Sequence, residues 1–251
     1  MSIITVSADY ESWIADVTDF ITELATTAIA ERGRFTFAFS GGNTPRPVYE
    51  RLASARYSDR IDWSRVHIFF GDERCVPPDD PRSNYHMART TLCDRVPIPA
   101  THVHRIHGED PPEQAAEEYA KELWRAFGDS YRMGGSPASG FDLVLLGMGD
   151  NGHTASIFPG LAAVTESVHW VMAQYVEVAG MWRVTLTPVI LNAAHQVAFL
   201  VAGADKAEML SNVLEGPYQP GVLPAQIIKP THGELHWLID AAAAAQLRRI
   251  S

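Results

Sequence analysis

Cysteine is scarce in this sequence, and long hydrophobic runs are absent. Cys75 and Cys93 are the only cysteines among 251 residues and lack Cys-x-x-Cys spacing, so neither a zinc site nor a disulfide framework is predicted. No apolar run reaches the roughly 18 residues that would indicate a transmembrane helix. The N-terminal segment MSIITVSADYESW has no basic stretch and carries acidic residues at positions 9 and 11, so no signal peptide is expected. We therefore expect a cytoplasmic protein without a membrane partner.

Positive charge is also in short supply. Lys and Arg number 20 against 30 Asp and Glu, which gives a formal net charge of −10. A net acidic surface repels nucleic acid and anionic membranes, so neither is an expected partner. If the substrate is itself an anion, its cationic partners must be concentrated at one site. The position of each Arg or Lys near a glycine-rich turn is therefore informative.

Strand patterns alternate with helix patterns along the whole chain. Apolar residues make up 46% of the chain and charged residues 20%, which is typical of a globular protein with a sizeable core. The alternation predicts an α/β fold, namely a doubly wound, mostly parallel sheet with helices on both faces, in a single domain spanning residues 1–251. The expected strands are Ile3–Val6, Phe35–Phe39, Val66–Phe70, Phe141–Leu146, Trp170–Val176, Arg183–Leu186, Val197–Val201 and Leu235–Ile239, and the expected helices include Ile14–Ile29, Asn84–Leu92, Glu113–Phe127, Ala207–Leu214 and Ala241–Leu247.

One expected strand runs directly into a glycine-rich segment. The apolar run Phe141–Leu146 is followed by glycine at positions 147, 149 and 152, and then by His153. Glycine permits positive φ and a close approach of ligand to the main chain. A strand that delivers an imidazole to a glycine-lined rim is how an α/β enzyme presents a catalytic group. We therefore predict that His153 is catalytic, with a structural loop histidine as the alternative.

The same segment also matches G-x-G-x-x-G, the dinucleotide fingerprint. That match requires a long helix opening at the last glycine and an acidic residue about 20 positions later. Pro159 follows Gly152 too soon for such a helix, and residues 167–173 contain no carboxylate. We interpret the match as coincidental and predict no cofactor; a dinucleotide-binding oxidoreductase is the weaker alternative.

A second glycine turn follows the strand expected at Phe35–Phe39. Residues 40–45 read SGGNTP, which would place Thr44 at the N-cap of a helix and Pro45 at its first position. Backbone N–H groups at a helix start bind anions, although an ordinary βα turn would need the same glycines. The segment lacks the Gly-Lys-Ser/Thr of a Walker loop. We predict that a phosphate is bound by Ser40, Gly41, Gly42 and Thr44.

Charged side chains follow or interrupt other expected strands. Asp72 and Arg74 come directly after Val66–Phe70, at the edge where open α/β sheets bind ligands. Arg74 could clamp an anion and Asp72 could orient it or transfer a proton, unless the two form an internal ion pair of a surface loop. Lys206 opposes the dipole of the helix that it begins, which is explained if it serves a bound anion, with an ordinary exposed lysine as the alternative. Arg183 interrupts an apolar strand and points either to water or into a cleft.

Three histidines, His102, His104 and His107, lie close together and raise the question of a metal site. No further ligand is evident nearby, and Arg105 would oppose a cation. We predict an exposed edge strand there and no bound metal. Because no serine elbow, His-Glu-x-x-His motif or nucleophilic cysteine is found, the residues alone indicate a metal-free hydrolase or isomerase acting on a small phosphorylated molecule.

As a set, these motifs closely resemble the 6-phosphogluconolactonase family. The resemblance is carried by SGGNTP at 40–45, GDER at 71–74, Ser83-Asn84 and GMGDNGHTASIFP at 147–159, and RVTLTP at 183–188, GADKA at 203–207 and PAQ at 224–226 continue it in order. It implies hydrolysis of 6-phospho-D-glucono-1,5-lactone to 6-phospho-D-gluconate in the oxidative branch of the pentose phosphate pathway, without a cofactor. It also implies a fold similar to that of glucosamine-6-phosphate deaminase.

The resemblance further implies roles for individual residues. His153 would activate water, assisted by Arg74, Asp72 and Asn151. Lys206, Arg183 and the SGGNTP turn would hold the phosphate. The family usually carries Asp-Gly-His, whereas this chain has Asn151 before Gly152, and an amide hydrogen-bonds but holds no charge.

Two other functions stay open at this point. A glucosamine-6-phosphate deaminase/isomerase-like enzyme would carry a Phe-Asn-Glu-Pro run after the Gly-His, where this chain has Ser-Ile-Phe-Pro at 156–159. A sugar-phosphate sensor would keep the pocket but, through Asn151, lose the chemistry. In each case the expected partner is a small phosphorylated sugar, for the lactonase its lactone, and the chain is expected to be a monomer or a homodimer.

Overall fold

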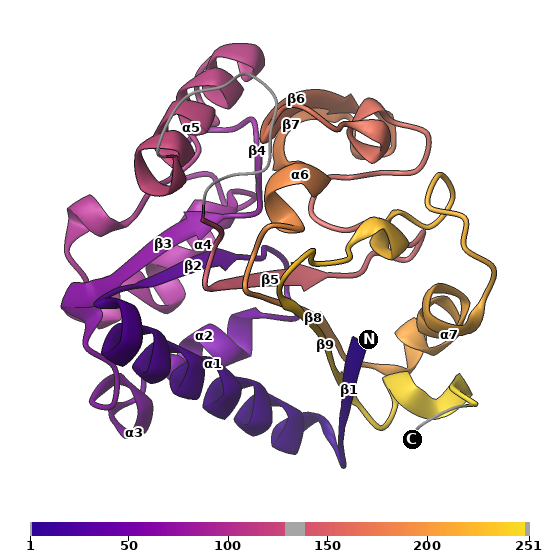
Figure 1. Ribbon diagram of the computed structural model, residues 1–251, viewed down its shortest axis with the longest axis horizontal. Helices are drawn as coiled ribbons and strands as arrows, with labels where there is room; N and C mark the ends of the chain where they lie inside the picture. The colour runs from indigo at the N-terminus through magenta and orange to yellow at the C-terminus, as the bar shows by residue number, and fades with distance from the viewer. Residues whose placement is uncertain (1, 129–138, 249–251) are drawn as a thin grey trace.

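The computed structural model describes residues 2–128 and 139–248, and its larger sheet has six strands, all parallel (Figure 1). The strand order is β1-β9-β8-β5-β2-β3. The bounds are β1 Ser2–Ser7, β2 Phe35–Phe39, β3 Val66–Phe70, β5 Leu143–Gly147, β8 Gln196–Val201 and β9 Glu234–Asp240. The predicted strands are therefore present, with the bounds of β2 and β3 as predicted.

Helices cover both faces of this sheet. Parallel strands need crossover connections, and these are right-handed in almost all proteins. The connections after β1 and β2 therefore lie on one face and the later ones on the other, as Figure 1 shows for α1 and α2 against α5 and α6. The doubly wound α/β fold is thus confirmed. The helices are α1 Tyr10–Arg32, α2 Arg46–Leu52, α3 Ala55–Ser58, α4 Asn84–Thr91, α5 Pro112–Phe127, α6 Pro188–Leu191 and α7 Ala207–Glu215.

A second, three-stranded antiparallel sheet in the order β4-β7-β6 lies above the main sheet in Figure 1. Its strands are β4 Asp72–Arg74, β7 Met181–Leu186 and β6 Val171–Val176. The GDER segment is therefore a strand rather than a surface loop. In its register Arg74 faces Arg183 and Asp72 faces Thr185.

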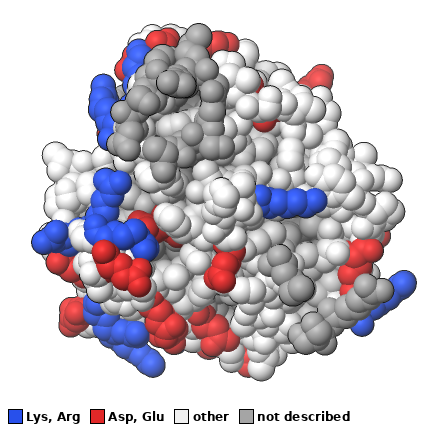
Figure 2. Space-filling model, viewed as in Figure 1, with Lys and Arg blue, Asp and Glu red and all other residues white. Residues whose placement is uncertain are grey.

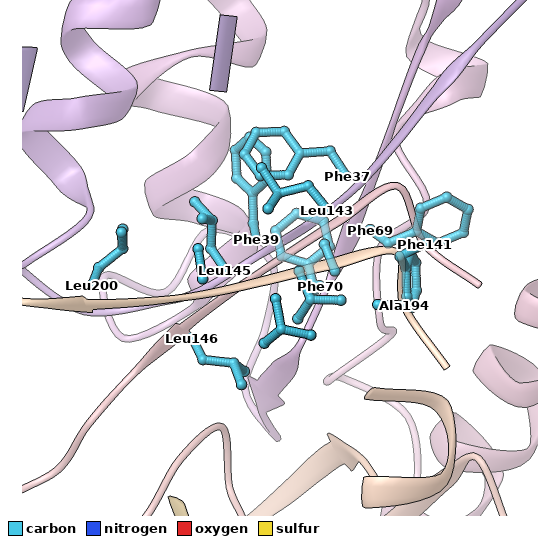
Figure 3. Close-up of a cluster of buried hydrophobic side chains, with 14 of the residues drawn as sticks. Phe37, Phe39, Phe69, Phe70, Phe141, Leu143, Leu145, Leu146, Ala194 and Leu200 are labelled. Atoms are coloured by element: carbon cyan, nitrogen blue, oxygen red, sulfur yellow. The ribbon is translucent and has the colours of Figure 1, made fainter. Parts of the chain in front are cut away.

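The hydrophobic core lies on both faces of the central strands. All five residues of β2 are buried, as are four of the five in β3 and in β5, because a parallel sheet is covered on both sides. Figure 3 shows aromatic side chains of β2 and β3 packed with leucines of β5. Full burial of each such side chain stabilises the folded state by about 1.5–3 kcal/mol relative to leaving it exposed. One contiguous core favours the single-domain prediction, which stays a prediction.

The direction in which successive strands are added to the sheet reverses after β3, and the switch point lies between the neighbouring strands β2 and β5. β1, β2 and β3 are added toward one edge, whereas β5, β8 and β9 are added toward the other. The loops after β2 and β5 therefore leave toward opposite faces and open a crevice at their carboxyl ends, the usual ligand site of such sheets. These are the SGGNTP and GMGDNGH segments.

The helix predicted at Ala241–Leu247 is wrong. The alanine-rich C-terminal segment forms only a 3₁₀ turn, Ala243–Gln246, whose first N–H is bonded to the Asp240 carboxylate. A run this short cannot offset the cost of helix nucleation by propensity alone. The predicted connector Met133–Gly140 falls mostly outside the described residues.

The histidines at 102–107 do not form an exposed edge strand. Residues Ala100–His102 form a 3₁₀ turn, and only Val103 bridges to Ile68 of β3. The prolines at 97 and 99 interrupt any strand here because they cannot donate a ladder hydrogen bond. The His104 imidazole lies between His67 and Glu122 of α5 rather than in solvent.

Candidate active site

A cleft of about 210 Å³ lies at the crevice between β2 and β5. All of the predicted site residues except Asn151 line it. They are Ser40, Gly41, Gly42, Thr44, Asp72, Arg74, His153, Arg183 and Lys206, joined by neighbours such as Gly149, Ser156 and Phe158. A larger cavity of about 630 Å³, between α4 and α5, contains none of the predicted residues. The chemistry-bearing side chains therefore define the site better than cavity size does.

Asn151 sets the tautomer of the His153 imidazole. Its Oδ1 accepts the backbone N–H of His153 at 3.2 Å and lies 2.6 Å from His153 Nδ1. An atom that accepts a backbone N–H is an oxygen acceptor, so Nδ1 must carry the proton and donate to it. The Nε2 atom is then left unprotonated. Asn151 thus lies beside the cleft, where it holds the ring in the form that can accept a proton.

The imidazole is held on its faces as well. The ring stacks on Phe158 with centroids 3.9 Å apart and planes at 15°. A Cβ at Gly149 would lie 2.0 Å from the ring, so only glycine leaves room for it there. Burial lowers the pKa of His153, with the nearby charge of Asp72 acting against this and those of Arg183 and Lys206 adding to it. The side chain is therefore a neutral base at neutral pH.

Asp72 is anchored rather than free to move. Its Oδ2 accepts from Ser156 Oγ at 2.6 Å and its Oδ1 from Asn84 Nδ2 at 3.0 Å, and the side chain is buried. Arg183 Nη1 lies 3.9 Å from Oδ2. This carboxylate is thus placed to orient Arg183, and no hydrogen bond between it and the imidazole is found among the described contacts.

Two arginines face each other across the small sheet and carry unused hydrogen-bonding capacity. Arg74 and Arg183 are register partners, and each has a buried Nε without a hydrogen-bond partner. Arg74 also donates from Nη1 to the carbonyl oxygen of Arg82. Burial lowers the pKa of Arg183, and the charge of Asp72 opposes that effect. A buried donor without an acceptor is costly, so an anion in the cleft would be stabilised by both side chains.

The SGGNTP turn differs in detail from its prediction. Thr44 is not the N-cap of a helix, because α2 starts at Arg46 after Pro45 and has no side-chain cap. The N–H of Ser40 is bonded to the hydroxyl of Tyr49, so it is not available to a ligand. Gly41 packs against Asn84, with no room for a Cβ, and Gly42 has φ of +93°. The turn therefore lines the cleft as a loop packed against Asn84, and not as the capped start of a helix.

Lys206 lines the cleft but is already paired. It occupies the N-cap position of α7, and its Nζ contacts Asp150 Oδ1. The hydrogen bond to Lys206 is also the main reason that the pKa of Asp150 is lowered. Asp150 therefore serves Lys206 and does not substitute for a carboxylate beside His153.

Three supporting residues were missed from the sequence as site residues: Asn84, Ser156 and Phe158. Asn84 and Ser156 hold Asp72, while Phe158 stacks on His153. All three lie within the motifs of the resemblance, which is the signal that could have identified them. Ser156 is 84 residues from Asp72 along the chain, a separation that no local pattern reports.

Other classes of site find little support among the described residues. No helix opens after Gly152, and the next regular element is a 3₁₀ turn, Ala162–Thr165, so the dinucleotide fingerprint lacks its structural context. No group of three or more His, Cys, Asp or Glu side chains is arranged to hold a metal ion in the parts of the chain that are described. Within those parts, no helix combines the length and apolar character needed to cross a membrane.

Basic and acidic side chains are interspersed on the face shown in Figure 2, without an extended basic area. Cations are instead gathered locally, since Arg74, Arg183 and Lys206 all line the cleft. This is the distribution expected of a net acidic protein that binds a small anion.

Comparison with known proteins assigns a family. The model of glucosamine-6-phosphate isomerases/6-phosphogluconolactonase matches residues 8–237. A 6-phosphogluconolactonase of Nostoc sp. is 41% identical over 97% of this chain and 98% of its own length. The solved 6-phosphogluconolactonase of Thermotoga maritima is 30% identical with a TM-score of 0.80, covering 96% of this chain and 100% of that one.

A monomeric glucosamine-6-phosphate deaminase has the same fold. Its structure covers 97% of this chain and 99% of its own with a TM-score of 0.80, but at 19% identity the likeness concerns the fold alone. The expected similarity to the deaminase fold is thereby confirmed. Because the family model spans nearly the whole chain and the Nostoc relative aligns along almost its full length, this chain belongs to the glucosamine-6-phosphate isomerase/6-phosphogluconolactonase family.

Proposed function

We propose that this protein hydrolyses 6-phospho-D-glucono-1,5-lactone to 6-phospho-D-gluconate, the lactonase step of the oxidative pentose phosphate pathway. The observation that carries the proposal is the position of His153, whose Nδ1 lies 2.6 Å from Asn151 Oδ1, in the same cleft as three cationic side chains. The Nostoc and Thermotoga relatives, both called 6-phosphogluconolactonase, support the same reaction. No observation in the site favours the deaminase.

His153 acts as the general base in this mechanism. Its Nε2 accepts a proton from water as the water oxygen attacks the lactone carbonyl carbon. The ester bond to the ring oxygen then breaks, and the imidazolium returns the proton to that oxygen, so the histidine ends neutral. The donated hydrogen bond from Nδ1 to Asn151 keeps Nε2 as the accepting atom throughout.

Arg74 stabilises the negative charge that develops on the carbonyl oxygen. Its Nε is buried without a partner, so a new acceptor in the cleft satisfies it. Asp72 is given no proton transfer in this scheme, because its described hydrogen bonds are to Ser156 and Asn84 and none joins it to the imidazole. It holds Arg183 in place.

The phosphate is remote from the bond that breaks and supplies binding energy that orients the lactone. Lys206 and Arg183 contribute charge, and the turn formed by Ser40, Gly41, Gly42 and Thr44 contributes hydroxyl and backbone groups. Substrate and product share this phosphate, so the same residues bind both.

The direct test supplies freshly made 6-phosphogluconolactone and measures acid release above the spontaneous rate in an enzyme-free control. His153→Ala should lower kcat by about 10²–10⁴-fold, the usual contribution of a general base, while 6-phosphogluconate still binds. His232→Ala, at an exposed position that does not line the cleft, is the matched control. Near-wild-type turnover by His153→Ala would remove the general-base role, and tight phosphogluconate binding without any turnover would instead indicate the sugar-phosphate sensor.

The proposal retains the remaining expectations from the sequence. The reaction needs no cofactor in this scheme, its partner is the phosphorylated lactone, and the chain acts as a monomer or homodimer without nucleic acid. We place it in the cytoplasm, which fits two cysteines that are both free thiols.

A further inference from the structure

The ammonium of Lys206 already contacts a carboxylate of this chain. Its Nζ contacts Oδ1 of Asp150, and the Lys206 side chain is 19% exposed whereas that of Asp150 is 87% exposed. The second carboxylate nearby, Asp205 Oδ2, is 3.9 Å from Nζ. A mostly buried cation is thus neutralised by an exposed carboxylate, and we call the contact between Lys206 Nζ and Asp150 Oδ1 the Asp150 latch.

The two partners of the latch come from neighbouring strand ends. Asp150 lies in the glycine-rich segment after β5, and Lys206 lies at the start of α7 after β8. β5 and β8 pair in parallel, so their carboxyl ends are side by side. Lys206 lines the cleft, whereas Asp150 is absent from its lining. The carboxylate therefore reaches the lysine from the rim.

An anion that enters the cleft must compete with this carboxylate. An ammonium has three N–H donors and could contact two anions at once, but these would then repel each other at short range. Phosphate binding therefore either displaces Asp150 or keeps it at a cost in free energy. In both cases the carboxylate weakens binding of the phosphate.

We propose that Asp150 is an internal competitor for the phosphate of the substrate and so sets the affinity of the phosphate subsite. The inference rests on the proposed function only for the identity of the bound anion. Because substrate and product carry the same phosphate, the latch weakens both complexes and favours release of the product. Among the described hydrogen bonds, the Asp150 side chain is bonded to Lys206, whereas that of Asn151 is bonded to His153.

The test is Asp150→Asn, which removes the charge and keeps the side-chain shape. We expect the Kd of 6-phosphogluconate, measured by titration calorimetry, to fall by about two- to fivefold, the range of one exposed ion pair. The gain should shrink as salt is added, because the pair lies at the surface. Asp205→Asn is the matched control, since it removes the same charge 3.9 Å from the same ammonium, and its effect should be smaller.

Two results with the ligand would overturn the proposal. An unchanged or weaker affinity in Asp150→Asn would mean that the carboxylate does not compete, or that it positions the lysine for the phosphate. An equal gain in Asp150→Asn and Asp205→Asn would mean a general field effect rather than a specific contact.

A ligand-free measurement separates the latch from the proposed function. In a double-mutant cycle of Asp150→Asn and Lys206→Met followed by thermal unfolding, the latch predicts a stabilising coupling between the two positions. If the two positions show no coupling, the latch is overturned, even if the lactone is hydrolysed. If the lactone is not hydrolysed but inorganic phosphate binds more tightly to Asp150→Asn than to the wild type, the latch stands and the lactonase assignment falls.

Discussion

At the scale of single residues, the tautomer of His153 is set by an uncharged neighbour. Asn151 Oδ1 fixes the Nδ1 proton by a 2.6 Å hydrogen bond without adding charge, and burial keeps the pKa of the imidazole below its ordinary value. A carboxylate at the same position would orient the ring equally well but would also stabilise the imidazolium. The amide therefore fixes the same tautomer as a carboxylate would, but leaves the pKa of the imidazolium lower.

The pH profile of the reaction should reflect this residue. A general base must be neutral, so kcat/KM falls as pH decreases through the pKa of His153, and the lowered pKa puts this decline below about pH 6.5. In Asn151→Asp the added charge raises that pKa, so the decline should move upward by about one pH unit. The measurement is kcat/KM against pH for both proteins, and superimposable acidic limbs would contradict the role given to Asn151.

At the scale of elements, the short strand β4 and the helix α4 hold each other in place. The buried Glu73 carboxylate accepts the N–H groups of Asn84 and Tyr85 at 2.7 and 2.8 Å, and the Ser83 hydroxyl at 2.9 Å. These are groups at the start of α4 that the helix itself cannot satisfy. Glu73 thus caps α4 while its neighbours in β4, Asp72 and Arg74, face the cleft.

Replacing Glu73 should therefore destabilise the fold rather than the chemistry alone. Glu73→Gln loses the charge and one acceptor oxygen, leaves buried donors unsatisfied, and should lower the free energy of unfolding by about 2–4 kcal/mol. Urea denaturation measures this. Glu23→Gln, at an exposed position of α1, is the control and should change stability by less than about 0.5 kcal/mol. Equal midpoints for the two variants would show that the cap contributes nothing.

At the scale of the whole molecule, a cluster of histidines joins β3, the 100–104 segment and α5. The His67 ring stacks on that of His102 with centroids 3.9 Å apart, and its Nδ1 lies 3.1 Å from His104 Nε2. His104 Nδ1 is in turn 2.7 Å from Glu122 Oε1. Burial, together with the charges of His102, His104 and Arg34, lowers the pKa of His67 to about 4. Burial also lowers the pKa of His104, against the opposing effect of Glu122.

This cluster should make the protein less stable in mild acid. A histidine whose folded pKa lies below its unfolded value binds protons more readily when unfolded, so stability falls as pH drops from about 6.5 toward 4. His67→Gln should flatten the dependence of Tm on pH in that window. His232→Gln, at an exposed site, should leave the slope as in the wild type. Parallel Tm curves for wild type and His67→Gln would exclude the cluster as the cause.

The fold and most of the site could be predicted because their signals are local. Strands such as Phe35–Phe39 and Val66–Phe70 are mostly apolar, with one polar residue each, and glycine turns follow the strands that approach the cleft. Parallel strands all end at one edge, so residues just after β2, β3, β5 and β8 had to lie near one another. The sequence by itself therefore determined the fold class and which segments surround the cleft.

Only the tertiary structure decided how those side chains are paired. Ser156 holds Asp72 across 84 residues and Lys206 holds Asp150 across 56, while His104 is half-buried and bonded to Glu122 of α5 instead of lying in an edge strand. Local periodicity reports which face of an element is apolar, but a hydrogen bond or ion pair between distant segments depends on sub-ångström packing of the whole chain. For that physical reason the partners of Asp72, Lys206 and His104 could not be read from their neighbours in sequence.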